Sequence, residues 1–381
     1  MKMSRRYGPS SPKYFIYLIA FIVTCFIFFK TGNDTLRTDY LSKYNINSYN
    51  REKTYYFPFS NRFKMPKYSY MRIDDNSIPD SGRALEEHIM HFNLNYLSRK
   101  DIVNTNKILI LTLMETYNDE YWNNLMNLTF EKQSTEIGLM VLSNEEGDEI
   151  LKKLEKKIIE IQEQKEDGVF KKITILRASD NIGQIPIDTD ETEMELIKRK
   201  YMATLKNELF VSTIGPETRY VLWLGSEIIN TPASLVEDLI SLDKPVVTTN
   251  IQIKNKESDS SESYDYGNSK SWIENVNWYN KLQTYPQSSV FMEGIGEIAT
   301  ERVRINHLMD VTATTENNLK TVEMDSVSME CTLVQSDVHR DGAMFPNFPF
   351  YHLIDSEGFS KMVKRLQYEV YGLPNYLVYH S

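Results

Sequence analysis

Four short apolar runs, separated by longer amphipathic segments, constrain the fold of this 381-residue chain more than any other feature. Continuous apolar runs of strand length are typical of strands buried on both faces of a parallel sheet. The runs are KILILTLM (107–114), IGLMVL (137–142), KITILR (172–177) and RYVLWL (219–224). Residues 245–251, PVVTTNI, predict one further strand.

The segments between these runs have the periodicity of helices. Between the second and third runs, Ile150, Leu154 and Ile158 recur at every fourth position among charged residues, which predicts one apolar helix face. Residues 191–210 predict another helix before the fourth run. Strand and helix therefore alternate, and the sequence predicts an α/β protein with a doubly wound sheet.

The N-terminus carries a separate signal. Residues 14–29 contain no charge, and the basic residues Lys2, Arg5, Arg6 and Lys13 precede them. A helix of this length spans roughly 24 Å, which suits a thin bilayer when flanking lysines extend to the interface. We expect an uncleaved signal anchor with a cytosolic tail. A cleaved signal peptide is the alternative, although no small-x-small cleavage site follows the apolar run.

These segments give an expected domain layout. We predict a cytosolic tail over 1–13, a transmembrane anchor over 14–29, a lumenal stem and wrapping segment over 30–105, and a catalytic-type domain over 106–381. The polar stretch 252–270 predicts a surface loop within that domain. The net charge of −10 and the lack of a basic block make nucleic acid an unfavourable partner.

The end of the fourth predicted strand is a prime position for chemistry, because ligands of open α/β sheets bind beyond the carboxyl ends of strands. Gly225, Ser226 and Glu227 follow that strand. A carboxylate in this place suits a hard cation such as Mn²⁺ or Mg²⁺. Only one carboxylate is present, so a simple turn that ends the strand is an equally open interpretation.

The C-terminal third holds further candidates. Asp355 and Glu357 precede a helix predicted over about 359–369. Their carboxylates would either interact favourably with the N-terminal end of the helix dipole or contact sugar hydroxyls. His380 ends an apolar strand-like run and is a candidate metal ligand, with a structural role as the alternative. The segment EEHIMH (86–91) predicts a solvated helix face rather than a zinc site.

Long strings rich in proline and aromatic residues carry a resemblance over roughly 54–380. They are YYFPFSNRFKMPKYSY, KILILTLMETYNDEYWNNL, NELFVSTIGPETRYVLWL, HRDGAMFPNFPFYHLI and GLPNYLVYH. The chain resembles the yeast Golgi α-1,6-mannosyltransferases that form the mannan polymerase complexes, and is nearest to the subunit that both complexes share. The resemblance implies a single-pass type II Golgi membrane protein with a GT-A-type, Rossmann-like nucleotide-sugar domain, assembled with related mannosyltransferase subunits.

The resemblance also implies site residues. Glu227 and His380 match metal-site positions for Mn²⁺, Lys198 and Arg199 match basic positions that face the GDP-mannose donor, and Asp325 or Glu357 would address the donor or acceptor. The chain departs from the family's Asp-x-Asp, which Gly225-Ser226-Glu227 replaces. A family arginine is Lys206 here, and the family's glycine-rich loop is Asp325-Ser326-Val327-Ser328-Met329.

These departures leave two main hypotheses. The chain is either an active enzyme that transfers mannose from GDP-mannose onto the α-1,6 backbone of an N-glycan mannan acceptor, or a degenerate paralogue that acts in assembly or acceptor binding. The second follows from the clustering of the departures at the donor site. A membrane-tethered lumenal binding protein unrelated to mannan is a third interpretation.

Overall fold

The computed structural model describes most of the chain after residue 106 and three short strands before it. The described residues are 46–47, 68–74, 87–93, 106–142, 145–162, 170–178, 191–254, 261–263, 270–273, 283–291, 303–307 and 318–381. No helix among them is long and apolar enough to cross a membrane. The predicted anchor over 14–29 lies outside the described residues.

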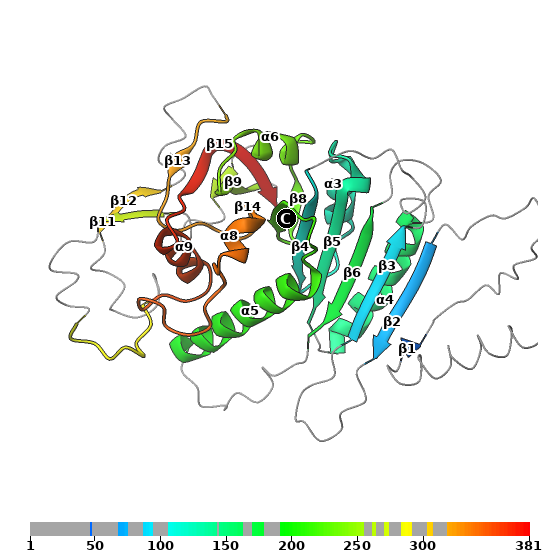
Figure 1. Cartoon of the computed structure of the whole chain (residues 1–381), viewed down its shortest axis with the longest axis horizontal. Helices are drawn as coiled ribbons and strands as arrows, with labels where there is room; N and C mark the ends of the chain where they lie inside the picture. The colour runs from blue at the N-terminus through cyan, green and yellow to red at the C-terminus, as the bar shows by residue number, and fades with distance from the viewer. Residues whose placement is uncertain are drawn as a thin grey trace, which may run out of the picture.

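One large mixed sheet forms the centre of the molecule (Figure 1). Within the described residues its main path has the order β1-β2-β3-β6-β5-β4-β7-β14-β9-β15-β13, with β10 beside β9 and β8 beside β15. Its strands are β1 (Ile46–Asn47), β2 (Tyr68–Asp74), β3 (Glu87–Asn93), β4 (Ile108–Met114), β5 (Thr135–Val141), β6 (Lys172–Arg177), β7 (Tyr220–Leu224), β8 (Ile228–Asn230), β9 (Val246–Lys254), β10 (Ser261–Ser263), β13 (Val322–Glu323), β14 (Cys331–Gln335) and β15 (Val370–His380). A separate pair joins β11 (Lys270–Ile273) to β12 (Val303–His307).

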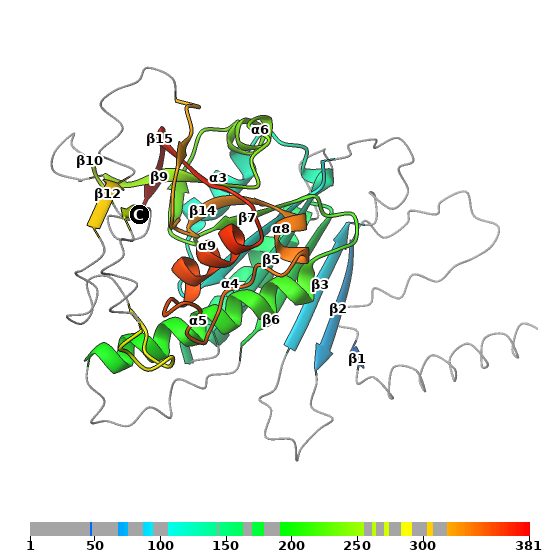
Figure 2. The ribbon, with the colours of Figure 1, turned by 60° about the vertical axis from the view of Figure 1, so that its left-hand side comes forward.

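The two faces of the sheet are covered by different helices. They are α3 (Asp119–Asn127), α4 (Glu145–Gln162), α5 (Glu191–Thr213), α6 (Leu235–Ser241), α8 (Ser336–Arg340) and α9 (Asp355–Arg365). Helices α3, α4 and α6 contribute to one buried cluster, and α5, α8 and α9 to the other. Figure 2 shows α5, α8 and α9 in front of the sheet and α4 behind it.

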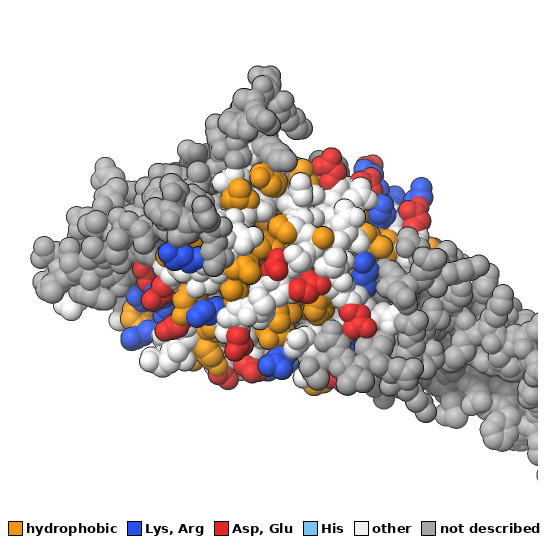
Figure 3. All heavy atoms as spheres, turned by 90° about the horizontal axis from the view of Figure 1, so that it is seen from above, with side chains coloured by type: hydrophobic (Ala, Val, Ile, Leu, Met, Phe, Trp, Pro, Cys, Tyr) orange, Lys and Arg blue, Asp and Glu red, His pale blue; other side chains and the backbone are white. Residues whose placement is uncertain are grey.

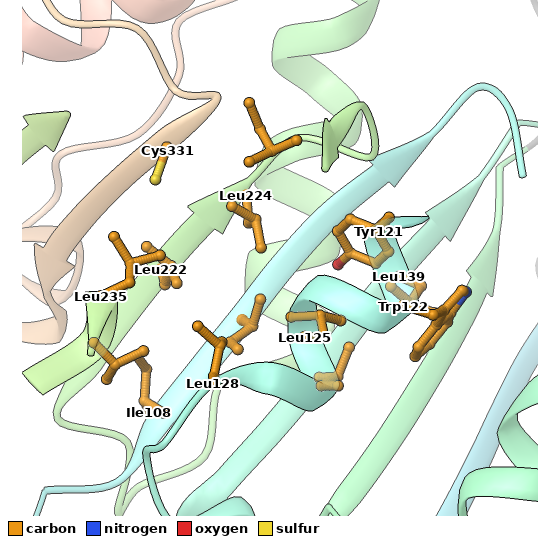
Figure 4. Packing of buried hydrophobic residues seen from close by; sticks show 14 of the residues in the cluster. Ile108, Tyr121, Trp122, Leu125, Leu128, Leu139, Leu222, Leu224, Leu235 and Cys331 are labelled. Carbon is orange, nitrogen blue, oxygen red and sulfur yellow. The ribbon is translucent and has the colours of Figure 1, made fainter. Parts of the chain in front are cut away.

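Alternation along the strands decides which core each residue joins. On β4, Ile108 and Ile110 pack in the first cluster, whereas Leu109 and Leu111 pack in the second. Successive side chains of a strand point to opposite faces, so an unbroken apolar run fills both cores. Figure 4 shows the first cluster, in which α3 lies against the strands. The predicted α/β class and the five predicted strands are confirmed.

Three local predictions need correction. The segment 86–91 was expected as a helix, but β3 pairs antiparallel with both β2 and β6, which satisfies its backbone as a strand. The polar stretch 252–270 is not all loop, because β9 continues to Lys254 and β10 pairs with it. The helix expected from 359 begins at Asp355 and includes Gly358, where an added Cβ would lie 2.3 Å from Cγ of Pro346. Glycine serves that close approach rather than marking the helix boundary.

Candidate functional site at the strand ends

Several strands bring their ends to one edge of the sheet. Strands β4 and β7 are parallel, β14 runs antiparallel to β7 and to β9, and β9 is parallel to β15. The carboxyl ends of β4, β7, β9 and β15 therefore share an edge with the amino end of β14. Figure 1 places the C-terminus beside β8 at this edge.

Glu227 lies three residues beyond the end of β7 and is held by hydrogen bonds from two directions. The hydroxyl of Thr116, which follows β4, donates to Oε1 of Glu227. Ser381, which follows β15, donates from Oγ to Oε2 at 2.8 Å and from its backbone N–H to the Glu227 carbonyl at 2.9 Å. The ends of three strands thus fix this carboxylate, and the predicted strand-end position of Glu227 is where the structure places it.

His380 is the last residue of β15 and lies opposite Ile228 in the antiparallel pairing with β8. That register puts His380 next to the strand end that carries Glu227. Its Nδ1 is 3.1 Å from the carbonyl oxygen of Ser381. The structure therefore brings the two predicted metal-site residues to the same edge.

A third acidic residue reaches this edge from β14. Glu330 directly precedes the strand, its carbonyl oxygen accepts a 2.7 Å hydrogen bond from the Gly225 N–H, and its carboxylate lies over Gly225. Burial raises the pKa of Glu330 above its ordinary value. Glu115 and Asp355 add to the rise, while Lys206 and His380 oppose it. This carboxylate therefore costs free energy in its charged form.

Among the cations that act on Glu330, Lys206 on α5 has the largest effect on its pKa. Its Nζ donates to both carboxylate oxygens of Asp355, at 2.8 and 3.0 Å, and both side chains are largely buried. The positive charge also acts on Glu330. The α5–α9 contact thus holds a lysine whose charge reaches the acidic strand ends while its ammonium group is paired with Asp355.

The two predicted donor-binding residues lie earlier on α5. Arg199 donates from Nε to Oε1 of Glu195, one turn back on the same helix, at 2.7 Å, and Lys198 is exposed. Arg199 and Lys206 are seven residues apart, so they share one helix face about 10 Å apart. Neither Lys198 nor Arg199 has a described hydrogen bond to Glu227 or His380 among the contacts of the described residues.

Of the two predicted catalytic carboxylates, Glu357 belongs to α9 and Asp325 is bound to it. Asp325, just beyond β13, accepts a hydrogen bond from Lys364 of that helix. Glu357 is buried in the first turn of α9. Val327, two residues after Asp325, is also joined to α9, because its backbone N–H donates a 3.3 Å hydrogen bond to the Ser360 hydroxyl. These residues form a second group, anchored through α9 rather than through the strand ends.

The donors at the strand ends fit a divalent cation in their chemistry. Carboxylate oxygens from Glu227 and Glu330 and an imidazole nitrogen from His380 are ligands that Mn²⁺ accepts. In the part of the chain that the structure describes, no three acidic, histidine or cysteine side chains, these three included, lie close enough together to hold a metal ion by themselves. A small hard cation is often held by only one or two carboxylates together with substrate phosphates.

Figure 3 views the molecule from above and shows acidic and basic side chains interspersed with apolar and uncharged ones on the described part of that surface. The sequence indicated Glu227 and His380, which the structure places at this edge, but gave no sign of Glu330, because only the register of β14 against β7 reveals its position. It also missed Thr116, which is near in space through the parallel pairing of β4 with β7. A mixed α/β sheet with donors of this kind at its strand ends defines a class of ligand-binding α/β proteins.

The chain belongs to the Anp1 family, whose model matches residues 88–349. It is 39% identical over 303 residues to "Mannan polymerase complex subunit MNN9" of Candida albicans, covering 77% of this chain and 80% of that protein. It is 34% identical over 285 residues to "Mannan polymerase complex subunit mnn9" of Schizosaccharomyces pombe, covering 74% and 82%. The resemblance expected from the sequence is thereby confirmed.

Among solved structures, the chain is similar to "Mannosyltransferase PcManGT from Pyrobaculum calidifontis in complex with GDP-Man and Mn2+". The likeness has a TM-score of 0.36 at 10% identity and covers 75% of this chain. The chain spans about three fifths (61%) of that structure.

Proposed function

We propose that the chain is a subunit of a Golgi mannan polymerase complex that extends the α-1,6-linked mannan backbone of N-glycans. The observation that supports this most strongly is the 39% identity to a protein named as such a subunit, over four fifths of that protein's length. Relatives named as subunits of complexes I and II extend the same argument to related partner subunits. The N-glycan mannan chain is the proposed acceptor.

GDP-mannose is the proposed donor, bound at the strand-end edge. Glu227 and His380 would hold Mn²⁺ there, and the bound cation would neutralise part of the diphosphate charge. Lys206 supports this placement because it already lies beside the edge, held by Asp355. Lys198 and Arg199 would add positive charge along α5, with Arg199 on the same helix face as Lys206.

The catalytic and acceptor roles are proposed for Asp325 and Glu357. Glu357 is part of the first turn of α9, and Asp325 accepts a hydrogen bond from Lys364 of that helix. The same first turn provides Asp355, the partner of Lys206. A shared helix would connect the donor edge to the carboxylates that face the acceptor. We propose a GT-A-type domain over 106–381, behind a stem over 30–105, an anchor over 14–29 and a tail over 1–13, in the type II orientation.

A second function is favoured by Gly225. Because this residue brings no carboxylate to the strand end, the chain could act in assembly or acceptor binding beside an active relative. The two functions differ in whether this chain binds the donor. They share membership of the complex.

Calorimetric titration of the purified full-length chain with GDP, with and without Mn²⁺, separates the two functions. Micromolar binding that requires Mn²⁺ supports donor binding by this chain, and a folded chain that binds no GDP leaves the assembly role. Tagged chain isolated from yeast membranes should bring related mannosyltransferase subunits with it. Failure to recover any such subunit contradicts the proposed membership of the complex.

A further inference from the structure

The register of two neighbouring strands places Glu330 directly across from Gly225. The last pair between β14 and β7 at this edge is Cys331 with Leu224, so the next position along each strand brings Glu330 opposite Gly225. The 2.7 Å hydrogen bond from the Gly225 N–H to the Glu330 carbonyl continues this pairing. Side chains of directly opposed residues are close neighbours on a sheet.

The Glu330 carboxylate fills the space that a side chain at position 225 would take. A Cβ built on Gly225 would lie 1.8 Å from Oε2 and 3.0 Å from Cδ of Glu330. Contacts this short cannot coexist with an unchanged Glu330, so a side chain at 225 and the present Glu330 rotamer exclude each other. The acidic group at this point of the edge therefore comes from β14 instead of β7.

The surroundings of this carboxylate leave it available to a ligand. Within the described part of the chain, no side chain donates a hydrogen bond to it. Lys206, the cation that acts on it most strongly, has its ammonium group engaged by Asp355. Glu115 and Asp355 add negative charge nearby. A desolvated carboxylate without a donor is costly unless a cation completes its surroundings.

We propose that Glu330 supplies, across the β7–β14 pair, the second carboxylate of a divalent-cation site that Glu227 shares, in the volume left open by Gly225. This inference rests on the proposed donor site and deepens it. Two carboxylates at one strand-end edge match the number that often holds a small hard cation together with a diphosphate. The loss of a carboxylate at position 225 is thereby compensated from the adjacent strand.

The test uses full-length chain purified in detergent, with Mn²⁺ as the probe, alone and with GDP. Electron paramagnetic resonance of free Mn²⁺ gives the bound fraction, and circular dichroism confirms folding. Glu330→Gln keeps the shape and removes the charge, so we expect Mn²⁺ affinity in the presence of GDP to fall at least tenfold. The control Glu369→Gln removes an exposed carboxylate before β15 and should leave the affinity unchanged.

A relocation pair tests position independently of charge loss. Gly225→Asp alone should weaken binding, because its Cβ collides with Glu330. Gly225→Asp combined with Glu330→Ala removes the collision and returns a carboxylate to the same space, so affinity should recover to within about threefold of the unsubstituted chain. Recovery supports the inference.

The outcomes separate this inference from the proposed function. If the unsubstituted chain binds Mn²⁺ with GDP and Glu227→Gln abolishes that binding, while Glu330→Gln binds normally, the role of Glu330 is overturned and the donor site stands. A folded, unsubstituted chain that binds no Mn²⁺ even with GDP overturns both. Tenfold weaker binding by Glu330→Gln, with recovery in the double variant, supports both.

Discussion

Two partly buried glutamates at opposite edges of the same sheet have opposite surroundings. Glu136, near the amino end of β5, lies 2.6 Å from Nζ of Lys171 and 2.8 Å from Nζ of Lys172. Burial raises its pKa, but the two lysines outweigh burial and hold the pKa below its ordinary value. Glu330 at the other edge has no such donor among the residues that the structure describes, and its pKa is raised.

The difference indicates that Glu136 contributes its charge to the stability of the fold, whereas the charge of Glu330 is left uncompensated by the described residues. At the amino edge, cations from the chain itself compensate the carboxylate, so the folded state favours its charged form. At the carboxyl edge, the folded state alone disfavours the charged form of Glu330. An external cation would reverse that balance, which is why this edge rather than the other is the candidate site.

The largest expected effect comes from breaking the compensated pair. Glu136→Gln leaves Lys171 and Lys172 beside each other without their shared anion, and should lower the free energy of unfolding by about 3 kcal/mol, the lower end for a broken buried pair. Urea unfolding followed by circular dichroism measures this change. Lys153→Met, on the helix surface, is a matched charge-removal control. A loss no greater than that of the control would contradict the structural role of Glu136.

His339, a buried histidine, gives a second case in which burial disfavours a charged form, and it predicts a pH dependence of stability. Nε2 of His339 accepts from Nε1 of Trp223 at 3.3 Å, and its Nδ1 lies 2.8 Å from the Ala343 carbonyl, so both nitrogens suit the neutral ring. Burial lowers its pKa to about 4, although the Ala343 carbonyl opposes the change. The unfolded chain, with a histidine pKa near 6.5, binds the proton first as pH falls.

The contribution of neutral His339 to the free energy of unfolding is therefore fully present above about pH 6.5 and is lost as the pH falls toward 4. Between pH 7 and pH 5 the loss should be about 2 kcal/mol. Urea unfolding at a series of pH values, with His339→Gln beside the unsubstituted chain, measures it. An equally steep pH dependence in His339→Gln would assign the effect to other groups.

The uncompensated glutamate should respond in the opposite direction from Glu136. Without added metal, Glu330→Gln removes a disfavoured charge and should leave the free energy of unfolding unchanged or raise it by up to about 1 kcal/mol. With saturating Mn²⁺ and GDP, the unsubstituted chain should gain thermal stability, because a ligand that binds the folded state stabilises it. The variant, which binds the cation weakly, should gain less. A metal-free loss of stability comparable to that of Glu136→Gln would contradict the contrast between the two edges.

The smallest effect is expected on α5. Arg199→Met removes a half-exposed helix pair with Glu195 and should change stability by at most about 0.5 kcal/mol. If Arg199 also meets the donor, its loss should weaken Mn²⁺-dependent GDP binding several-fold in the same preparation. Unchanged GDP affinity would remove Arg199 from the proposed donor site.

The sequence predicted local features well and relationships between strands poorly. The runs that became β4, β6 and β7 were predicted within a residue or two, because apolar runs and helical periods are local signals. The end of β7 also indicated Glu227. Glu330 could not be found in this way, since its position depends on β14 pairing antiparallel with a strand about a hundred residues earlier. The start of α9 was missed because Gly358 serves packing against Pro346.

The mutual exclusion between a side chain at position 225 and the present rotamer of Glu330 has an evolutionary consequence. A chain that carries acidic residues at both positions has to move the Glu330 carboxylate out of the space beside residue 225. The exchange of one carboxylate position for the other is therefore simplest through a form with a small residue at one of the two positions. Across related chains, glycine at one position should therefore accompany an acid at the other, as an epistatic pair.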